Sequence, residues 1–343
     1  MKTAVVICPG RGTYNKAELG YLSRHFSQAA LLADFDAQRE AAGQESVSAL
    51  DGADRFSMAK HTRGDNASAL IYASSLGDFL SIDQEAVEII AVTGNSMGWY
   101  TTLACAGSVG AQDGFRIANT MGTLMQDNLV GGQLVYPIVD EQWQVDPARL
   151  SQLEACVAEI NARKGHALHL SIRLGGMLVL AGDDAGLKAF EQAVEPVQER
   201  FPMRLANHAA FHTRMMAHVA QLGRDALPVS LFQNPSIPMI DGRGHIWWPH
   251  ACDMAELHDY TLRTQVEEVY NFTHAIRIAA REFAPDLFIV AGPGNTLGGA
   301  VAQSLIAADW AGLDTKQAFL DRQQSDDPIL VSMGLAEQRA AVA

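Results

Sequence analysis

Short runs of hydrophobic residues, each ending in a turn that contains glycine, predict buried parallel strands. Three runs are clear, at 3–8, 87–93 and 287–291, and a fourth candidate lies at 237–241. Between the first two runs, residues 67–79 have the spacing of a helix with a small-residue face. Strands that alternate with helices are typical of a parallel sheet covered by helices. The pattern therefore predicts an α/β fold with a central, mainly parallel sheet.

The middle of the chain has a different order of elements. Alternation predicts four strands and helical periodicity predicts two helices, in the order 133–139 (strand), 147–163 (helix), 167–172 and 177–181 (a hairpin), 185–200 (helix) and 203–205 (strand). Asp183 or Asp184 is suited to cap the second helix. This β-α-β-β-α-β order matches a ferredoxin-like unit. We therefore expect a ferredoxin-like subdomain at 131–205, inserted in a large α/β domain formed by 1–130 and 206–343.

Composition excludes several classes of protein. With 343 residues, 48% of them hydrophobic and 19% charged, the chain can form a large core. No run reaches the roughly 18 apolar residues of a membrane span, and the apolar segment before Pro9 is too short for a secretory signal. The four cysteines are scattered, which indicates neither disulfides nor a zinc ribbon. The net charge of −14 argues against nucleic acid as a partner, and we expect a cytoplasmic protein.

Gly94-Asn95-Ser96-Met97-Gly98 is the strongest candidate for chemistry. It follows a predicted strand and precedes a stretch that suits a helix, which is the setting of a nucleophile elbow. Small residues let the chain turn sharply, and the helix N-terminus can stabilise a developing oxyanion. Ser96 is therefore the candidate nucleophile.

A serine nucleophile needs a base, and His212 is the best candidate because it follows the last strand of the expected subdomain. His208 and His212 have i, i+4 spacing, which could also suit zinc, but no third ligand follows at a suitable spacing, so we predict no metal. The glycines of 292–298 resemble a dinucleotide-binding turn. Only about 45 residues follow them, too few for the rest of a nucleotide fold, so a turn that lines the site is the better interpretation.

Four motifs in the same order resemble the malonyl-CoA:acyl carrier protein transacylase family, which includes acyltransferase domains of polyketide and fatty acid synthases. Residues 8–13 (CPGRGT) resemble the pattern FPGQGS, and residues 94–100 (GNSMGWY) resemble GHSLGEY. Residues 210–212 (AFH) resemble the segment that ends in the catalytic histidine, and 292–297 (GPGNTL) resemble GPGKxL. That family also carries a ferredoxin-like subdomain at the position expected here.

The resemblance implies a role for each matching residue. Ser96 would hold the acyl group as an ester, and His212 would be the general base and later the acid. The main-chain N–H groups of Arg11 and Met97 would form the oxyanion hole. The match of 269–272 (VYNF) to the family pattern PVxW implies that the carbonyl of Asn271 orients the histidine. No aspartate partner is then required.

The sequence departs from the family where a malonyl carboxylate would bind. The family arginine of the pattern RGxxMQ is replaced by Met121 in 121–126 (MGTLMQ). A carboxylate buried beside methionine would lose its partner at a cost of several kcal/mol. We therefore expect an acyl group without a free carboxylate, unless Arg173 supplies a replacement cation. Asn95 and Trp99 replace the usual histidine and acid beside the serine, and Trp99 either packs or narrows the entrance.

The segment Ala209-Ala210-Phe211-His212 resembles the family version that goes with unbranched acyl groups. We therefore expect an acyl pocket lined by Met121, Phe211, Asn95, Arg173 and Trp99. Acyl-CoA or acyl-phosphopantetheine would be a substrate rather than a bound cofactor, and an acyl carrier protein the partner. The leading prediction is an acyltransferase. An acyl-acyl carrier protein hydrolase of the editing type and a non-catalytic carrier-binding subunit are the alternatives, whereas an α/β-hydrolase esterase would place its histidine nearer the C-terminus.

Overall fold

A six-stranded sheet forms the centre of the molecule in the computed structural model, which describes all 343 residues. Its order is β11-β10-β1-β2-β7-β8, and every pair is parallel except β7 with β8. The strands are β1 (Lys2–Cys8), β2 (Val87–Gly94), β7 (Met239–Ile240), β8 (Ile246–Trp247), β10 (Leu287–Val290) and β11 (Leu330–Ser332). The three clear hydrophobic runs are therefore strands, as predicted, and the fourth candidate is reduced to two residues.

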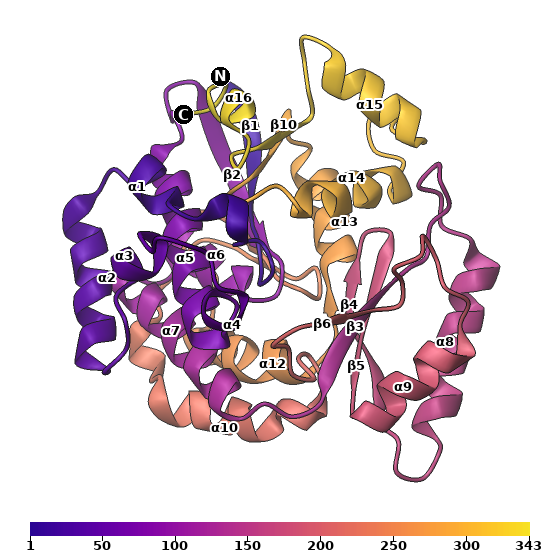
Figure 1. Cartoon of the computed structure of the whole chain (residues 1–343). Helices are drawn as coiled ribbons and strands as arrows, with labels where there is room; N and C mark the ends of the chain where they lie inside the picture. Colours follow the sequence, from indigo (N-terminus) through magenta and orange to yellow (C-terminus); the bar gives the residue numbers. More distant parts are fainter.

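Helices cover both faces of this sheet, with α1–α7 on one side and α13 and α14 on the other (Figure 1). The helices before the second sheet are α1 (Tyr21–His25), α2 (Ala29–Ala41), α3 (Val47–Asp51), α4 (Met58–His61), α5 (Gly64–Ser81), α6 (Gly98–Cys105) and α7 (Ala111–Asp127). Those after it are α10 (Ala217–Ala226), α11 (Met254–Asp259), α12 (Gln265–Glu267), α13 (Phe272–Phe283), α14 (Leu297–Ala307), α15 (Lys316–Gln324) and α16 (Ala336–Arg339). The predicted α/β fold is confirmed.

A second sheet lies to one side and has the order β6-β3-β5-β4-β9. Its strands are β3 (Gly132–Pro137), β4 (Leu168–Leu174), β5 (Met177–Gly182), β6 (Met203–Leu205) and β9 (Tyr270–Asn271). Helices α8 (Pro147–Asn161) and α9 (Asp184–Ala193) pack on its outer side (Figure 1). The later strand β9 adds to this sheet in parallel with β4, so the two parts of the molecule share backbone hydrogen bonds.

The predicted helix 185–200 is wrong at its C-terminal end. Asp183 caps α9 with its side chain, as expected, but the helix ends at Ala193. Val194 is already extended, and Pro196 follows two residues later. Proline disfavours helical backbone at the residue before it, so the apolar periodicity continued past the point where a helix could.

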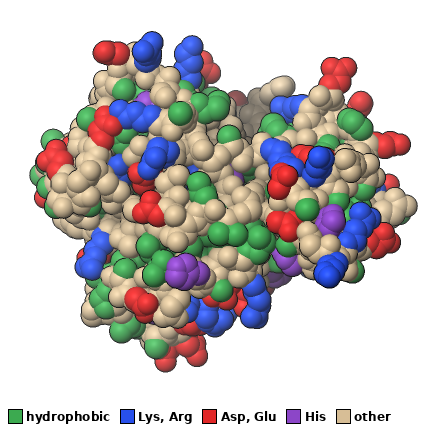
Figure 2. All heavy atoms as spheres, turned by 60° about the horizontal axis from the view of Figure 1, so that its bottom comes forward, with side chains coloured by type: hydrophobic (Ala, Val, Ile, Leu, Met, Phe, Trp, Pro, Cys, Tyr) green, Lys and Arg blue, Asp and Glu red, His purple; other side chains and the backbone are tan.

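The register of the central sheet positions the loops that carry the candidate motifs. Cys8 at the end of β1 pairs with Gly94 at the end of β2, so the two loops that follow lie side by side at the carboxyl edge. Ligands of open α/β sheets bind at this edge. Figure 2 shows hydrophobic side chains gathered between the part of the molecule built around the central sheet and the smaller part built around the second sheet. No helix combines the length and apolar character that a membrane span needs.

Candidate active site

Ser96 lies in a sharp turn between β2 and α6. Its φ is +54°, in the left-handed region that residues with a Cβ rarely adopt. The flanking glycines allow this turn because the chain passes very close to its neighbours. A Cβ on Gly98 would lie 2.1 Å from the carbonyl oxygen of Cys8, and one on Gly94 would lie 2.5 Å from the carbonyl carbon of Gly98. The turn therefore has the features of a nucleophile elbow.

His212 is within hydrogen-bonding distance of this serine. Its Nε2 lies 2.7 Å from the Ser96 Oγ, and its Nδ1 lies 2.6 Å from the main-chain oxygen of Gln265. Because a carbonyl oxygen only accepts, Nδ1 carries the proton and Nε2 is the acceptor for the serine hydroxyl. The imidazole is thus oriented to remove the Ser96 proton.

Burial keeps His212 neutral. The side chain is almost fully enclosed, and the ring of Tyr270 lies against it with 5.5 Å between the centroids. Loss of hydration lowers the pKa of His212 to about 4, and the hydrogen bond to Gln265 opposes this only in part. At pH 7 the imidazole is therefore in the neutral form, which a general base needs in order to accept a proton.

His208 has a different partner. Its Nδ1 lies 2.7 Å from the Oε1 of Gln133, and burial, together with the nearby Arg11, lowers the pKa of His208 to about 3. No three His, Cys, Asp or Glu side chains in the structure are grouped so that they could hold a metal ion.

The carbonyl that orients His212 belongs to Gln265, so the prediction of Asn271 is wrong. Asn271 lies in β9, where its N–H donates to the oxygen of Gly242 and its side chain accepts from the N–H of His274. The match to the family pattern selected a segment six residues too late. A carbonyl exists at every residue, so the sequence alone could not single out Gln265.

Gln265 contacts both Ser96 and His212. Besides the bond to His212, its Nε2 donates to the main-chain oxygen of Ser96 at 3.0 Å, and its Oε1 accepts from the hydroxyl of Tyr100. It follows a π-helical turn, η4 (Tyr260–Thr264). Such turns are rare and frequently occur at functional sites.

Two main-chain N–H groups are available for an oxyanion. Those of Arg11 and Met97 donate no hydrogen bond within the protein, and both residues line the same cavity as Ser96. Met97 directly precedes α6, whose N-terminus carries partial positive charge. The loops after β1 and β2 thus each bring one of the predicted donors beside the serine.

The cavity beside Ser96 differs from the expected acyl pocket. Its lining consists of Arg11, Ser68, Ser96, Met97, Tyr100, Gly122, Met125, Phe211, His212, Gln265 and Val266. Phe211 lines it as predicted, whereas Asn95 is buried next to the elbow without reaching it. No sequence motif marks Ser68, Gly122, Met125 and Val266, because only the packing shows which residues of a helix face inward.

Three other residues predicted for the acyl pocket lie elsewhere. Met121 is fully buried and its sulfur packs against Gly223 of α10. Trp99 is also fully buried, and its Nε1 donates to the Oγ1 of Thr261, so it belongs to the core.

Arg173 lines a separate cavity and pairs with Glu154. It is therefore not the replacement cation.

The side chain of Arg11 brings a cation into the cavity. Its Nη2 donates to the main-chain oxygens of Thr62 at 2.9 Å and Asn207 at 2.8 Å, while Nε is buried without a partner. The guanidinium carbon lies 5.4 Å from the centroid of the Phe211 ring. Burial lowers the pKa of Arg11 to about 10, which still leaves it charged at neutral pH, and Asp65 opposes the shift.

Known proteins with this fold include bacterial transacylases. No profile of a known protein family matches the chain. The malonyl-CoA:ACP transacylase of Synechocystis is 18% identical and superposes with a TM-score of 0.74 over 100% of both chains. The malonyl-CoA:acyl carrier protein transacylase of Xanthomonas oryzae is also 18% identical, with a TM-score of 0.75 over 99% of this chain and 97% of that one.

Polyketide synthases are similar as well. An acyltransferase domain of the salinomycin polyketide synthase is 17% identical, with a TM-score of 0.72 over 100% of this chain and 72% of that one. A highly reducing polyketide synthase of Emericella nidulans is 26% identical over 66% of this chain. A non-reducing polyketide synthase of Penicillium roqueforti is 26% identical over 43%. The matches span only 9% and 6% of these two synthases.

Together, the sheet order and the sharp turn at Ser96 define an α/β protein with a nucleophile elbow at the carboxyl edge of its central sheet. More specifically, the chain has the fold of the malonyl-CoA:acyl carrier protein transacylases and of polyketide synthase acyltransferase domains. The resemblance predicted from the four motifs is confirmed at the level of the fold.

Proposed function

We propose that this protein moves an acyl group from a CoA or carrier thioester, through an ester on Ser96, to the phosphopantetheine thiol of an acyl carrier protein. The observation that carries the proposal is the 2.7 Å contact between Ser96 Oγ and His212 Nε2 at the elbow. The fold adds support because it is shared with proteins named for acyl transfer between CoA and acyl carrier protein.

Each step of the transfer has a matching group in the site. His212 Nε2 takes the hydroxyl proton while Ser96 Oγ attacks the thioester carbonyl, whose oxygen becomes an anion held by the N–H groups of Arg11 and Met97. The carbon–sulfur bond then breaks, and the imidazolium returns its proton to the departing thiolate. The carrier thiol next gives its proton to His212 and attacks the ester, and Ser96 leaves with that proton.

The acyl group that fits this cavity lacks a free carboxylate. Helix α7 contributes Gly122 and Met125 to the lining, and neither can pair with an anion. Arg11 is the cation in the cavity, but its Nη2 is already bound to two carbonyl oxygens. An unpaired carboxylate would cost several kcal/mol in such a site. A neutral acyl group avoids this cost.

A basic face for an acidic carrier protein has few candidates left. The sequence offers four candidates, Lys60, Arg63, Arg204 and Arg214. Three of them form ion pairs: Lys60 with Glu45, Arg63 with Asp65, and Arg204 with Glu191 and Asp184. The fourth, Arg214, is exposed and forms no ion pair. We therefore place any electrostatic contact with the carrier at Arg214 rather than at Arg204.

The test is to incubate the protein with acetyl-CoA, butyryl-CoA, malonyl-CoA and the matching acyl carrier proteins, and to follow its intact mass. We expect an adduct on the native protein, none on Ser96→Ala, and release of the adduct only onto a carrier thiol. An adduct that instead decays in water, with free acid accumulating, would make the protein an acyl-carrier-protein hydrolase. The absence of any adduct or turnover would indicate a binding role and overturn the proposal.

A further inference from the structure

The guanidinium of Arg11 has hydrogen-bond donors for which the protein provides no acceptor. Its Nη2 donates to Thr62 and Asn207, and these are its only hydrogen bonds. The Nε–H group is buried and unpartnered, and the two N–H groups of Nη1 are also unpartnered. A buried donor without a partner is unfavourable, and more so in a charged group. A bound molecule that supplied an acceptor would remove this cost.

The occupied nitrogen limits what that acceptor can be. Arginine binds a carboxylate through two parallel N–H groups, and each of the two edges that offer such a pair includes Nη2. In Arg11 both hydrogens of Nη2 are used, by the oxygens of Thr62 and Asn207. The remaining donors on Nε and Nη1 act singly. They are suited to one oxygen, such as a hydroxyl, keto or amide oxygen, rather than to the fork of a carboxylate.

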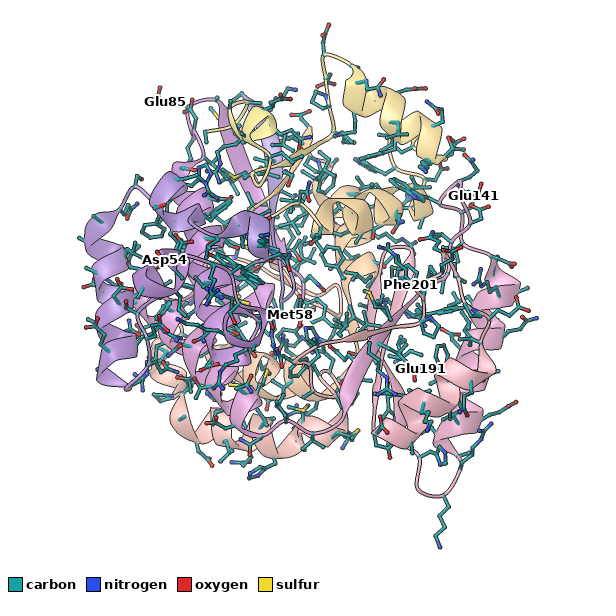
Figure 3. The ribbon with its side chains drawn as sticks, viewed as in Figure 1. Asp54, Met58, Glu85, Glu141, Glu191 and Phe201 are labelled. Atoms are coloured by element: carbon teal, nitrogen blue, oxygen red, sulfur yellow. The ribbon has the colours of Figure 1, made fainter.

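Arg11 lies between Ser96 and His212 on one side and an opening at the surface on the other. It lines the Ser96 cavity and also a neighbouring cavity that is bounded by Met58, Met203 and His208. Met58 is 64% exposed and Met203 is 39% exposed, so this second cavity opens to solvent. Figure 3 shows Met58 between the helices beside the central sheet and the second sheet. A thioester that entered there would pass the guanidinium on its way to Ser96.

We propose that Arg11 is a specificity-determining residue whose free N–H groups donate hydrogen bonds to a neutral oxygen of the thioester substrate. This inference rests on the proposed function. The oxygen belongs either to the acyl chain, as a 3-hydroxy or 3-oxo group, or to an amide of the pantetheine arm.

The test compares Arg11→Gln with the native protein, and with Arg55→Gln as a matched change at an exposed arginine that has no ion pair. The rate constant for Ser96 acylation is measured by intact mass with butyryl-CoA, 3-hydroxybutyryl-CoA, 3-oxobutyryl-CoA and malonyl-CoA. The N-acetylcysteamine thioester of each acyl group, which lacks most of the pantetheine arm, is measured in parallel. All the variants keep the main-chain N–H of residue 11.

For an acyl-chain oxygen, we expect the native preference for 3-hydroxy and 3-oxo donors over butyryl-CoA to fall about 10-fold or more in Arg11→Gln. For a pantetheine oxygen, the preference for CoA over N-acetylcysteamine thioesters falls by a similar factor instead. Arg55→Gln leaves both ratios unchanged. If Arg11→Gln does not fold, Arg11→Lys is used, and we expect a smaller loss of the same ratio because one donor group remains.

Two outcomes would overturn the inference. An equal decrease for all donors would make Arg11 a structural residue, and a loss confined to malonyl-CoA would show that it binds a free carboxylate. These outcomes are distinct from failure of the proposed function, in which the native protein forms no Ser96 adduct with any donor.

Discussion

Ser96 and His212 both have left-handed backbone conformations, with φ values of +54° and +58°. Neither is glycine, so each conformation costs on the order of 1–3 kcal/mol, which the surrounding fold must offset. Close packing around Gly94 and Gly98 holds the first turn, and the hydrogen bond to Gln265 holds the ring of the second residue. The two side chains therefore meet without a rearrangement of the backbone, which is the preorganisation that a nucleophile and its base require.

The depressed pKa of His212 predicts an unusual pH profile. Burial lowers this pKa from 6.5 to about 4, so the imidazole stays neutral until the pH falls close to 4. We expect the rate constant for Ser96 acylation to be constant between about pH 8 and 5.5 and to fall only as the pH approaches 4. Stopped-time intact-mass measurements with butyryl-CoA test this expectation. An inflection near pH 6.5 would show a solvated histidine and contradict it.

The lowered pKa of His212 also makes the stability of the protein depend on pH. The unfolded chain takes up a proton at His212 near pH 6.5, whereas the folded chain does so only near pH 4. The contribution of this residue to stability is therefore present above pH 6.5 and is lost as the pH falls toward 4. Acylation rates at the acid end must accordingly be measured on protein that circular dichroism shows to be folded.

At the level of elements, the sequence predicted the central strands well because buried parallel strands are continuous apolar runs. It predicted Ser96 and His212 because motifs mark them. It failed at Met121 because a helix turns by about 100° per residue, and on α7 Gly122 and Met125, three residues apart, face the cavity instead. Gln265 was missed for another reason. Its contacts with Ser96 and His212 use a main-chain carbonyl and a side-chain amide that follow a π-helical turn, and no spacing of hydrophobic residues marks such a position in the sequence.

Gln265 provides a prediction about the element that positions the pair. Gln265→Ala keeps the carbonyl that orients His212 but removes the bond from Nε2 to the oxygen of Ser96. We expect the rate constant for Ser96 acylation to fall about 10-fold and the free energy of unfolding to fall by about 1–2 kcal/mol, because buried polar groups lose partners. Intact-mass kinetics and urea denaturation measure these two effects.

Tyr100→Phe is the matched control for Gln265→Ala, because it removes only the weaker 3.3 Å bond to Oε1 and leaves the contact with Ser96. We expect it to change the acylation rate by less than about 3-fold. Equal effects of the two variants would mean that Gln265 supports the helix generally and does not position the serine.

At the scale of the whole molecule, one buried carboxylate joins the N-terminal and C-terminal parts of the chain. Asp78 of α5 accepts from the hydroxyl of Tyr21 in α1 and from the N–H of Gly292, each at 2.7 Å, and it pairs with Arg339 of α16. Its side chain is fully buried, and burial raises the pKa of this carboxyl while Arg339 opposes the rise. The short C-terminal helix is thus part of the support for the turn at 292–294, which follows β10.

We therefore expect Arg339→Met to be strongly destabilising, because it leaves the charge of Asp78 buried and unpaired. The free energy of unfolding should fall by about 3–5 kcal/mol at pH 7, against less than about 1 kcal/mol for Arg322→Met, which breaks an exposed pair with Asp327. In the variant the carboxyl gains a proton more readily in the folded state than in the unfolded state. The deficit relative to the native protein should then shrink as the pH is lowered from 7 to 5. Urea denaturation of the native protein and both variants at pH 7 and pH 5 measures these free energies of unfolding. If the difference between Arg339→Met and the native protein did not depend on pH, Arg339 would act through packing rather than through its charge.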